Sequence, residues 1–140
     1  MSKRIFSLIG LVALMVLLTG VLTAAAPVPN TTITFVNHLP SVMHVGETYT
    51  VEVQVTSDQT FTSVQAMPDF QYAGKGVVAV QGGDRTGQNT NATLFVTFEA
   101  KSVTAKMPDG VVPVSVIVGV RYGGGYVFVN QSTVNVQVVP

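Results

Sequence analysis

A strict alternation of apolar and polar side chains along several short segments is the feature that most constrains the fold. In Tyr49–Val55 a tyrosine and three valines alternate with threonine, glutamate and glutamine. The same pattern recurs in Ala92–Ala100, Val112–Val120 and Thr133–Val138. A period of two places one face of a strand in a core and the other in water. The chain is therefore predicted to form antiparallel sheets with one buried and one solvated face.

Weaker alternation predicts further strands at Thr31–Val36, Phe61–Met67 and Gly76–Val80. Turn-forming residues separate the strands, at Val45–Glu47, Gly82–Gly87, Pro108–Gly110 and Gly123–Gly125. Gly82–Gly87 is interpreted as a turn because it is too rich in glycine for a strand. Gly123–Gly125 predicts a hairpin between the strands Val112–Tyr122 and Tyr126–Val139. About seven to eight short strands in so short a chain predict an all-β, single antiparallel β-sandwich.

The N-terminus has the three parts of a secretory signal peptide. Lys3 and Arg4 precede the apolar run Ile5–Leu22, and small residues follow at Thr23–Ala26. We expect a signal helix that is cut after Ala25, with residues 1–25 as the signal peptide and 26–140 as one extracytoplasmic domain. The run of about 18 residues also reaches the lower limit of a membrane span, so an uncleaved anchor is the alternative.

Composition excludes several classes of function. The signal segment holds two of the seven basic residues, so five remain in the exported part against seven acidic residues. A slightly acidic domain without a basic cluster does not suit nucleic acid, and we expect membrane contact only through an uncleaved signal segment. Cysteine is absent, which excludes disulfides, thiol chemistry and cysteine-based metal sites.

One stretch has a family likeness. Pro40–Val53, which contains Val45-Gly46-Glu47-Thr48-Tyr49, resembles the opening of prokaryotic immunoglobulin-like and cohesin-like extracellular modules. The pair Val112–Tyr122 and Tyr126–Val139 resembles their closing hairpin. The chain lacks the cysteine pair and the tryptophan of antibody-type domains. The resemblance implies a single immunoglobulin-like β-sandwich that serves cell-surface structure or recognition.

No residue set requires a catalytic mechanism. There is neither a Gly-x-Ser-x-Gly motif nor a cysteine nucleophile, so we expect no enzyme and no cofactor. His38, Met43 and His44 form the alternative, a copper or zinc site, because nitrogen and thioether ligands suit copper. The simpler interpretation puts Met43 in the core and His44 in solvent. Calcium is a second alternative, through aspartates that loops would gather: Asp58, Asp69, Asp84 and Asp109.

Other candidate residues lie on the predicted surface. Asn30, Asn91 and Asn130 each begin an Asn-x-Ser/Thr triplet and are candidate glycosylation sites. Tyr122 and Tyr126 flank the glycine run and could stack on a sugar. The apolar residues Phe95, Ile117 and Val127 have outward parity and could form a partner surface.

The expected function is that of an exported, non-enzymatic structural or adhesion module at the cell surface or envelope. It would bind a protein partner or its own copies by surface complementarity or by strand addition. The leader Pro27–Val36 is the segment predicted to pair with a neighbour. The alternative is a small exported metal- or carbohydrate-binding sandwich.

Overall fold

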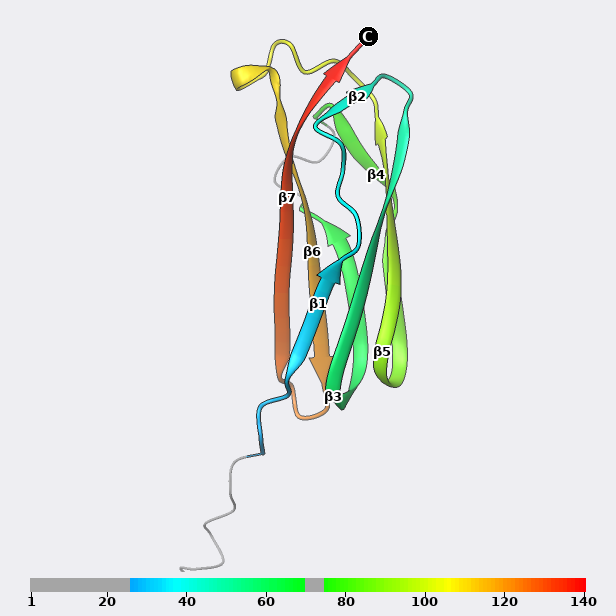
Figure 1. The fold of residues 1–140 in the computed structure, drawn as a ribbon, viewed down its shortest axis with the longest axis vertical. Helices are drawn as coiled ribbons and strands as arrows, with labels where there is room; N and C mark the ends of the chain where they lie inside the picture. The colour runs from blue at the N-terminus through cyan, green and yellow to red at the C-terminus, as the bar shows by residue number, and fades with distance from the viewer. Residues whose placement is uncertain (1–25, 70–74) are drawn as a thin grey trace, which may run out of the picture.

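The computed structural model describes residues 26–69 and 75–140, and these residues form an all-β fold (Figure 1). The predicted signal peptide, with its helix and its cut, lies outside the described residues. Seven strands are present in the described part: β1 Thr31–Phe35, β2 Val42–His44, β3 Thr48–Pro68, β4 Val77–Gln81, β5 Gly83–Ala100, β6 Val112–Tyr122 and β7 Val127–Val139. The 3-10 turn η2 spans Pro108–Gly110. No helix in this part of the chain is long and apolar enough to cross a membrane.

Hydrogen bonds join all seven strands in the order β2-β7-β6-β3-β5-β4, with β1 added on β3. The long strands β3 and β5 pair over most of their length, and both turn over at the same end of the molecule (Figure 1). At the turn, residues 57–60 of β3 lie opposite the single residue Thr90 of β5. The extra residues let β3 follow the outside of the bend.

The bend divides the sheet into two facing layers, an arrangement consistent with a β-sandwich. Layer 1 contains β1, residues 48–56 of β3, residues 91–100 of β5, and β4. Layer 2 contains residues 83–89 of β5, residues 61–68 of β3, β6, β7 and β2. Since β1 belongs to one layer and β2 to the other, the chain crosses between the layers at residues 36–41.

The core lies between the layers and is built from the inward parity of each strand. Valines dominate it, because β-branched side chains pack well between two pleated sheets. The largest fully buried side chains are Phe61, Phe98, Met43, Val53, Val55, Val64, Val96, Val112, Val118, Val120, Val136 and Val138. No buried side-chain nitrogen or oxygen among the described residues lacks a hydrogen-bond partner.

Tyr122 contacts both layers at the end of the molecule where β3 and β5 turn over. Its ring is buried and meets Phe61 edge-on, with the ring centroids 6.4 Å apart. Its hydroxyl donates to Ser57 Oγ at 2.7 Å and lies 2.5 Å from Thr31 Oγ1. One side chain of β6 therefore holds β1 and the bend of β3.

Most predicted strands and turns are confirmed. β6 begins and ends where the sequence predicts, and a turn with positive φ at Gly124 and Gly125 joins it to β7. Gly46 and Gly110 also have positive φ, at 90° and 68°, in turns that the sequence predicts.

Three predictions are wrong in detail. The separate strands Tyr49–Val55 and Phe61–Met67 are one continuous strand, β3. The predicted turn Gly82–Gly87 lies largely in β5, where residues 83–86 pair with residues 63–66 of β3. The sandwich is not wholly antiparallel, because β2 runs parallel to β7.

Candidate functional site

The outer face of layer 2 carries apolar side chains where alternation leads one to expect polar ones. Cross-strand register places Gln65 beside Gly119 and Gly119 beside Val129 on this face. In the next row, Met67 lies beside Ile117. Val127 and Val129 remain 43% and 58% exposed. Valines left this open on the outer face of a sheet contribute little to its core, which favours an interaction surface.

A shallow hollow of about 530 Å³ lies in this face. We call it the layer-2 hollow, and its lining residues come from three neighbouring strands: Ser63, Gln65, Met67, Ile117, Gly119, Arg121, Val127 and Val129. Its apolar walls are aliphatic, and no aromatic ring lines it. The hollow exists because the side chains around its floor are longer than the residue at its centre.

That central residue is Gly119, in the middle of β6. Its φ is not positive, so the backbone does not require glycine. A Cβ built on Gly119 would meet no atom within 4 Å, so the fold does not require glycine either. Glycine inside a strand costs stability and often marks a site where a ligand or another backbone approaches closely. Neither the backbone conformation nor the packing of the described residues therefore accounts for Gly119.

Arg121 is the one charged residue that lines the hollow. Its side chain is exposed, and no ion pair or side-chain hydrogen bond of its guanidinium forms within the described part of the chain. The ion pair of the described residues joins Lys101 Nζ to Glu99 Oε1 at 2.8 Å, at the end of β5 and outside the hollow. The hollow thus combines aliphatic walls with a cation that is free to accept an anionic partner.

The outer face of layer 1 is different in character. Threonines and glutamates occupy its outward positions, and the hydroxyls of Thr50 and Thr97 are hydrogen-bonded at 2.9 Å across β3 and β5. Phe95 stands among them, 52% exposed, opposite Glu52. The predicted outward direction of Phe95, Ile117 and Val127 is confirmed, but Phe95 lies on the opposite layer from the other two.

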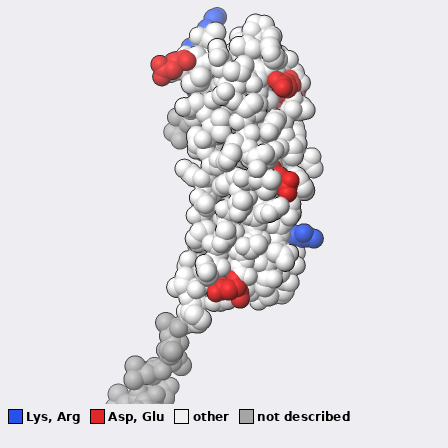
Figure 2. Space-filling view, in the orientation of Figure 1, with Lys and Arg blue, Asp and Glu red and all other residues white. Residues whose placement is uncertain are grey.

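Charged groups are few and widely spaced on the face seen in Figure 2. This agrees with the low charge of the chain, of which 10% is charged residues. A nearly neutral polar surface suits close packing against a neighbour, because little charge must be desolvated.

The residues of the metal alternative point in different directions. Met43 is fully buried in the core, as predicted. His44 is exposed, and its Nδ1 lies 2.8 Å from the carbonyl oxygen of Pro140. His38 is also exposed and contacts Ser132 Oγ through Nδ1 at 3.1 Å. No group of three or more His, Cys, Asp or Glu side chains within the described ranges is placed to hold a metal ion.

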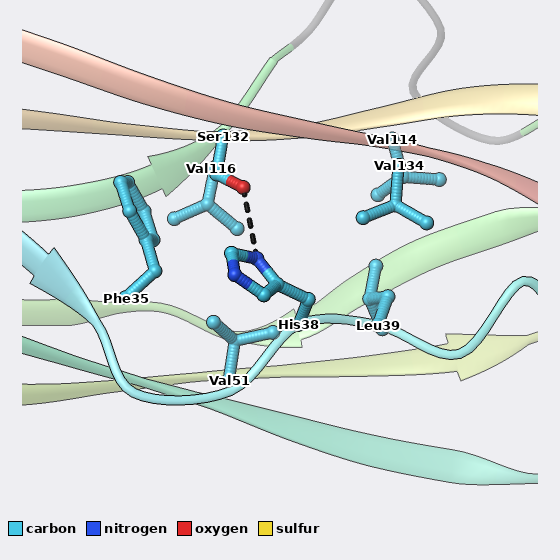
Figure 3. A pocket seen from close by; sticks show the side chains of 8 residues that line it. All are labelled: Phe35, His38, Leu39, Val51, Val114, Val116, Ser132 and Val134. Atoms are coloured by element: carbon cyan, nitrogen blue, oxygen red, sulfur yellow. Dashed lines mark hydrogen bonds between the residues drawn. The ribbon is translucent and has the colours of Figure 1, made fainter.

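His38 instead closes a small cavity at the open side between the layers (Figure 3). The imidazole lies near Phe35, with ring centroids 6.2 Å apart. Leu39, Val51 and Val134 line the cavity from three different segments. Its volume of about 10 Å³ is close to the minimum for one water molecule. The cavity is a packing gap, too small for a larger ligand.

The two tyrosines of the carbohydrate alternative are unequal. Tyr122 is buried, and its hydroxyl is used within the fold. Tyr126 is 40% exposed, and its ring centroid lies 5.9 Å from that of Tyr122. Only Tyr126 therefore presents an open ring.

The three candidate glycosylation asparagines, Asn30, Asn91 and Asn130, are all exposed. Asn30 exchanges hydrogen bonds with Asp58 at the bend of β3. Asn130 Oδ1 accepts a hydrogen bond from the backbone N–H of Gln131 at 2.8 Å. The acidic residues of the calcium alternative lie in separate segments, and Asp58 is used in the contact to Asn30.

Sequence reasoning missed most of the hollow. Ile117 and Val127 were identified by parity, but Gly119, Arg121, Met67 and Val129 were not. The available signal was a glycine at position 119 in a strand whose alternate residues from Val112 to Val120 are all valine.

Comparison with known proteins gives little. No protein-family model matches the chain, and no curated protein matches it. Among solved structures, the chain is similar to E. coli alpha-2-macroglobulin in its native conformation, at 16% sequence identity and a TM-score of 0.45. The similarity covers 83% of this chain and 7% of that chain. So distant a match carries no argument about function.

Proposed function

We propose that the chain is an exported, non-enzymatic module with an immunoglobulin-like sandwich fold, and that it binds a protein partner at the cell surface or envelope. Its working surface is the outer face of layer 2. The all-β, two-layer arrangement is compatible with such a fold. The signal-like segment of residues 1–25 supports export.

The observation that carries this proposal is Gly119 at the floor of the layer-2 hollow. A Cβ at this central strand position would meet no atom within 4 Å, yet the position holds glycine, which stabilises a strand less than alanine does. Exposed valines surround it, where water would favour threonine. Both departures are explained together if a partner covers the face and approaches the backbone of β6.

The structure changes the expected mode of binding. Residues 31–35 of the leader pair with residues 53–57 of β3 in the same chain. Thr31 is also fixed by Tyr122. Donation of this strand to a neighbour would break these contacts, so we favour docking on the sheet face over strand addition by the leader.

In-cell photocrosslinking tests the proposal. A photoreactive phenylalanine analogue replaces Val129 in the hollow or, as the matched control, Thr93 on the outer face of layer 1. Both positions are exposed on β-strands. After irradiation of intact cells of the source organism, we expect a discrete crosslinked protein from position 129 and none from position 93.

Two outcomes contradict the proposal. Equal crosslinking from both positions indicates random encounters, and no crosslinking from either indicates a face without a partner. Protease added to intact cells provides the test of location, because an exported surface protein is degraded while a cytoplasmic marker survives.

A further inference from the structure

We infer that the layer-2 hollow takes an extended peptide segment with an aliphatic side chain over Gly119 and a carboxylate, two residues away, on Arg121. This inference rests on the proposed function and names the chemistry of the partner. The segment has the form aliphatic-x-acidic.

The shape and composition of the hollow select the aliphatic side chain. Met67, Ile117 and Val129 form its apolar walls, and the floor at Gly119 has no side chain. Sugar rings and cationic groups are usually held by aromatic faces, which the hollow lacks. A branched or straight hydrocarbon side chain fills such a space without leaving a polar group unpaired.

The charge of the hollow selects the acid. A partner that covers Arg121 removes its guanidinium from water, which is costly unless an anion replaces the lost hydration. A carboxylate meets this need with two parallel hydrogen bonds to the guanidinium. None of the lining residues is acidic, and Asp84, which lies beyond Gln65 on β5 of the same face, forms no ion pair with Arg121 within the described residues, so the carboxylate is expected from the partner.

The spacing selects an extended segment. Gly119 and Arg121 are two residues apart on β6 and face the same side, about 7 Å from each other at the usual rise of a strand. Side chains at positions i and i+2 of an extended peptide have the same separation and the same direction. Ser63 and Gln65, on the neighbouring strand, make no side-chain hydrogen bond within the described residues and are available to the peptide backbone.

A second copy of the chain fits the hollow less well. Two copies packed with these hollows together bring two Arg121 guanidinium groups into one interface, while Asp84, the acidic residue of this face, lies outside the hollow on β5, two strands from Arg121. Like charges in a desolvated interface are unfavourable. The peptide therefore satisfies both features of the hollow, and self-association satisfies only its apolar part.

The test is an NMR titration of the ¹⁵N-labelled exported protein with two capped peptides. The probe is acetyl-Ser-Leu-Ser-Glu-Ser-amide, and its control has lysine in place of glutamate. We expect saturable shifts of the Gly119, Arg121 and Val129 amide signals with the probe, at a dissociation constant on the order of millimolar, and no saturable shift with the control. Shifts of equal size with both peptides overturn the inference. The absence of any shift at a peptide concentration of about 10 mM, ten times the expected dissociation constant, also overturns it.

Two variants locate the binding. Arg121→Gln keeps the stem and the hydrogen-bonding end but removes the charge, and we expect about 10-fold weaker binding of the probe. Gly119→Val fills the floor and abolishes the shifts, whereas Phe95→Thr on layer 1 leaves them unchanged. Unchanged affinity in Arg121→Gln overturns the assignment of the acid. Both variants are accepted only if their spectra retain the dispersion of the folded protein.

The two proposals fail in different ways. If position 129 crosslinks a partner in cells but the peptides do not bind, the partner exists and its chemistry is other than aliphatic-x-acidic. If position 129 crosslinks nothing, the proposed function itself fails. A translational diffusion coefficient that falls with protein concentration without peptide, together with concentration-dependent shifts of the Gly119 and Val129 amide signals, indicates a second copy on this face and overturns the peptide inference.

Discussion

The outer faces of layers 1 and 2 follow the same alternation of inward and outward side chains, but they differ in the kind of residue that points outward. On layer 1, threonine and glutamate fill the outward positions of β3 and β5, and Thr50 and Thr97 are hydrogen-bonded to each other across the strands. On layer 2, the outward positions around Gly119 hold Ser63 and Gln65 on one side, aliphatic residues on the other, and one cation, Arg121, that forms no ion pair within the described residues. Both faces cover the same core, so core packing does not account for the difference.

The period of a strand therefore identifies its buried face but says little about its exposed one. A face adapted only to water needs polar side chains and no glycine. The strands β3 and β5 of layer 1 fit this description apart from Phe95, while β4 at its edge leaves Val80 51% exposed. Layer 2 departs from it at several adjoining positions, and adjoining departures indicate a shared cause.

The largest expected effect tests whether the two faces depend on one core. Phe61 is fully buried at the bend that joins the layers. Phe61→Ala leaves a cavity there and should lower the free energy of unfolding by about 3–5 kcal/mol. Urea denaturation followed by circular dichroism should show both layers lost in one transition. Two separate transitions would mean that the layers, and their faces, fold independently.

A smaller loss of unfolding free energy is expected at Tyr122, which links the two layers. Tyr122→Phe keeps the ring against Phe61 but removes the hydroxyl that bonds Ser57 and lies against Thr31. We expect a loss of about 2 kcal/mol, because two hydrogen bonds disappear and their partners are only partly exposed. Hydrogen exchange should rise most in β1. Faster exchange spread evenly over all strands would contradict this local role.

Two glycines give effects of opposite sign. A Cβ on Gly83 of β5 would lie 2.8 Å from the carbonyl oxygen of Phe95, whereas one on Gly119 meets nothing within 4 Å. Gly83→Ala should therefore destabilise by about 1 kcal/mol or more, through overpacking of backbone. Gly119→Ala should stabilise by about 0.5–1 kcal/mol. The melting temperatures of the two variants, measured by thermal unfolding, test these signs. A lower melting temperature for Gly119→Ala than for the unaltered protein would show that the fold requires this glycine.

The smallest effects on stability concern the exposed apolar residues themselves. Val129→Thr and Phe95→Thr should each change the free energy of unfolding by less than about 0.5 kcal/mol, since neither side chain is in the core. Their effects on binding should differ. Val129→Thr should weaken peptide binding in the titration, and Phe95→Thr should not. Equal weakening by both would remove the distinction between the faces.

The strands were largely predictable because alternation reports burial directly. Val112–Tyr122 was predicted to the residue, since valines mark its inner face without interruption. The extent of β5 was not predictable in the same way. Glycines in residues 82–87 suggest a turn, yet Gly83 is needed where the inward side of β5 approaches the backbone of Phe95. A close approach between distant residues leaves no local signal.

The candidate site was predictable only in part for a related reason. Parity showed that Ile117, Val127 and Phe95 point outward, which the structure confirms. Parity does not show which strands are neighbours, and so Phe95 could not be separated from the other two. Gly119 and Arg121 became meaningful only when pairing with β3 and β7 placed aliphatic side chains around them.

The central claim is that Gly119 serves a partner and not the fold. Gly119→Val tests it most directly, by joint measurement of the melting temperature of the purified protein and of crosslinking from position 129 in cells. We expect a melting temperature equal to or above that of the unaltered protein, together with loss of the crosslinked partner. A lower melting temperature, or undiminished crosslinking, would contradict it.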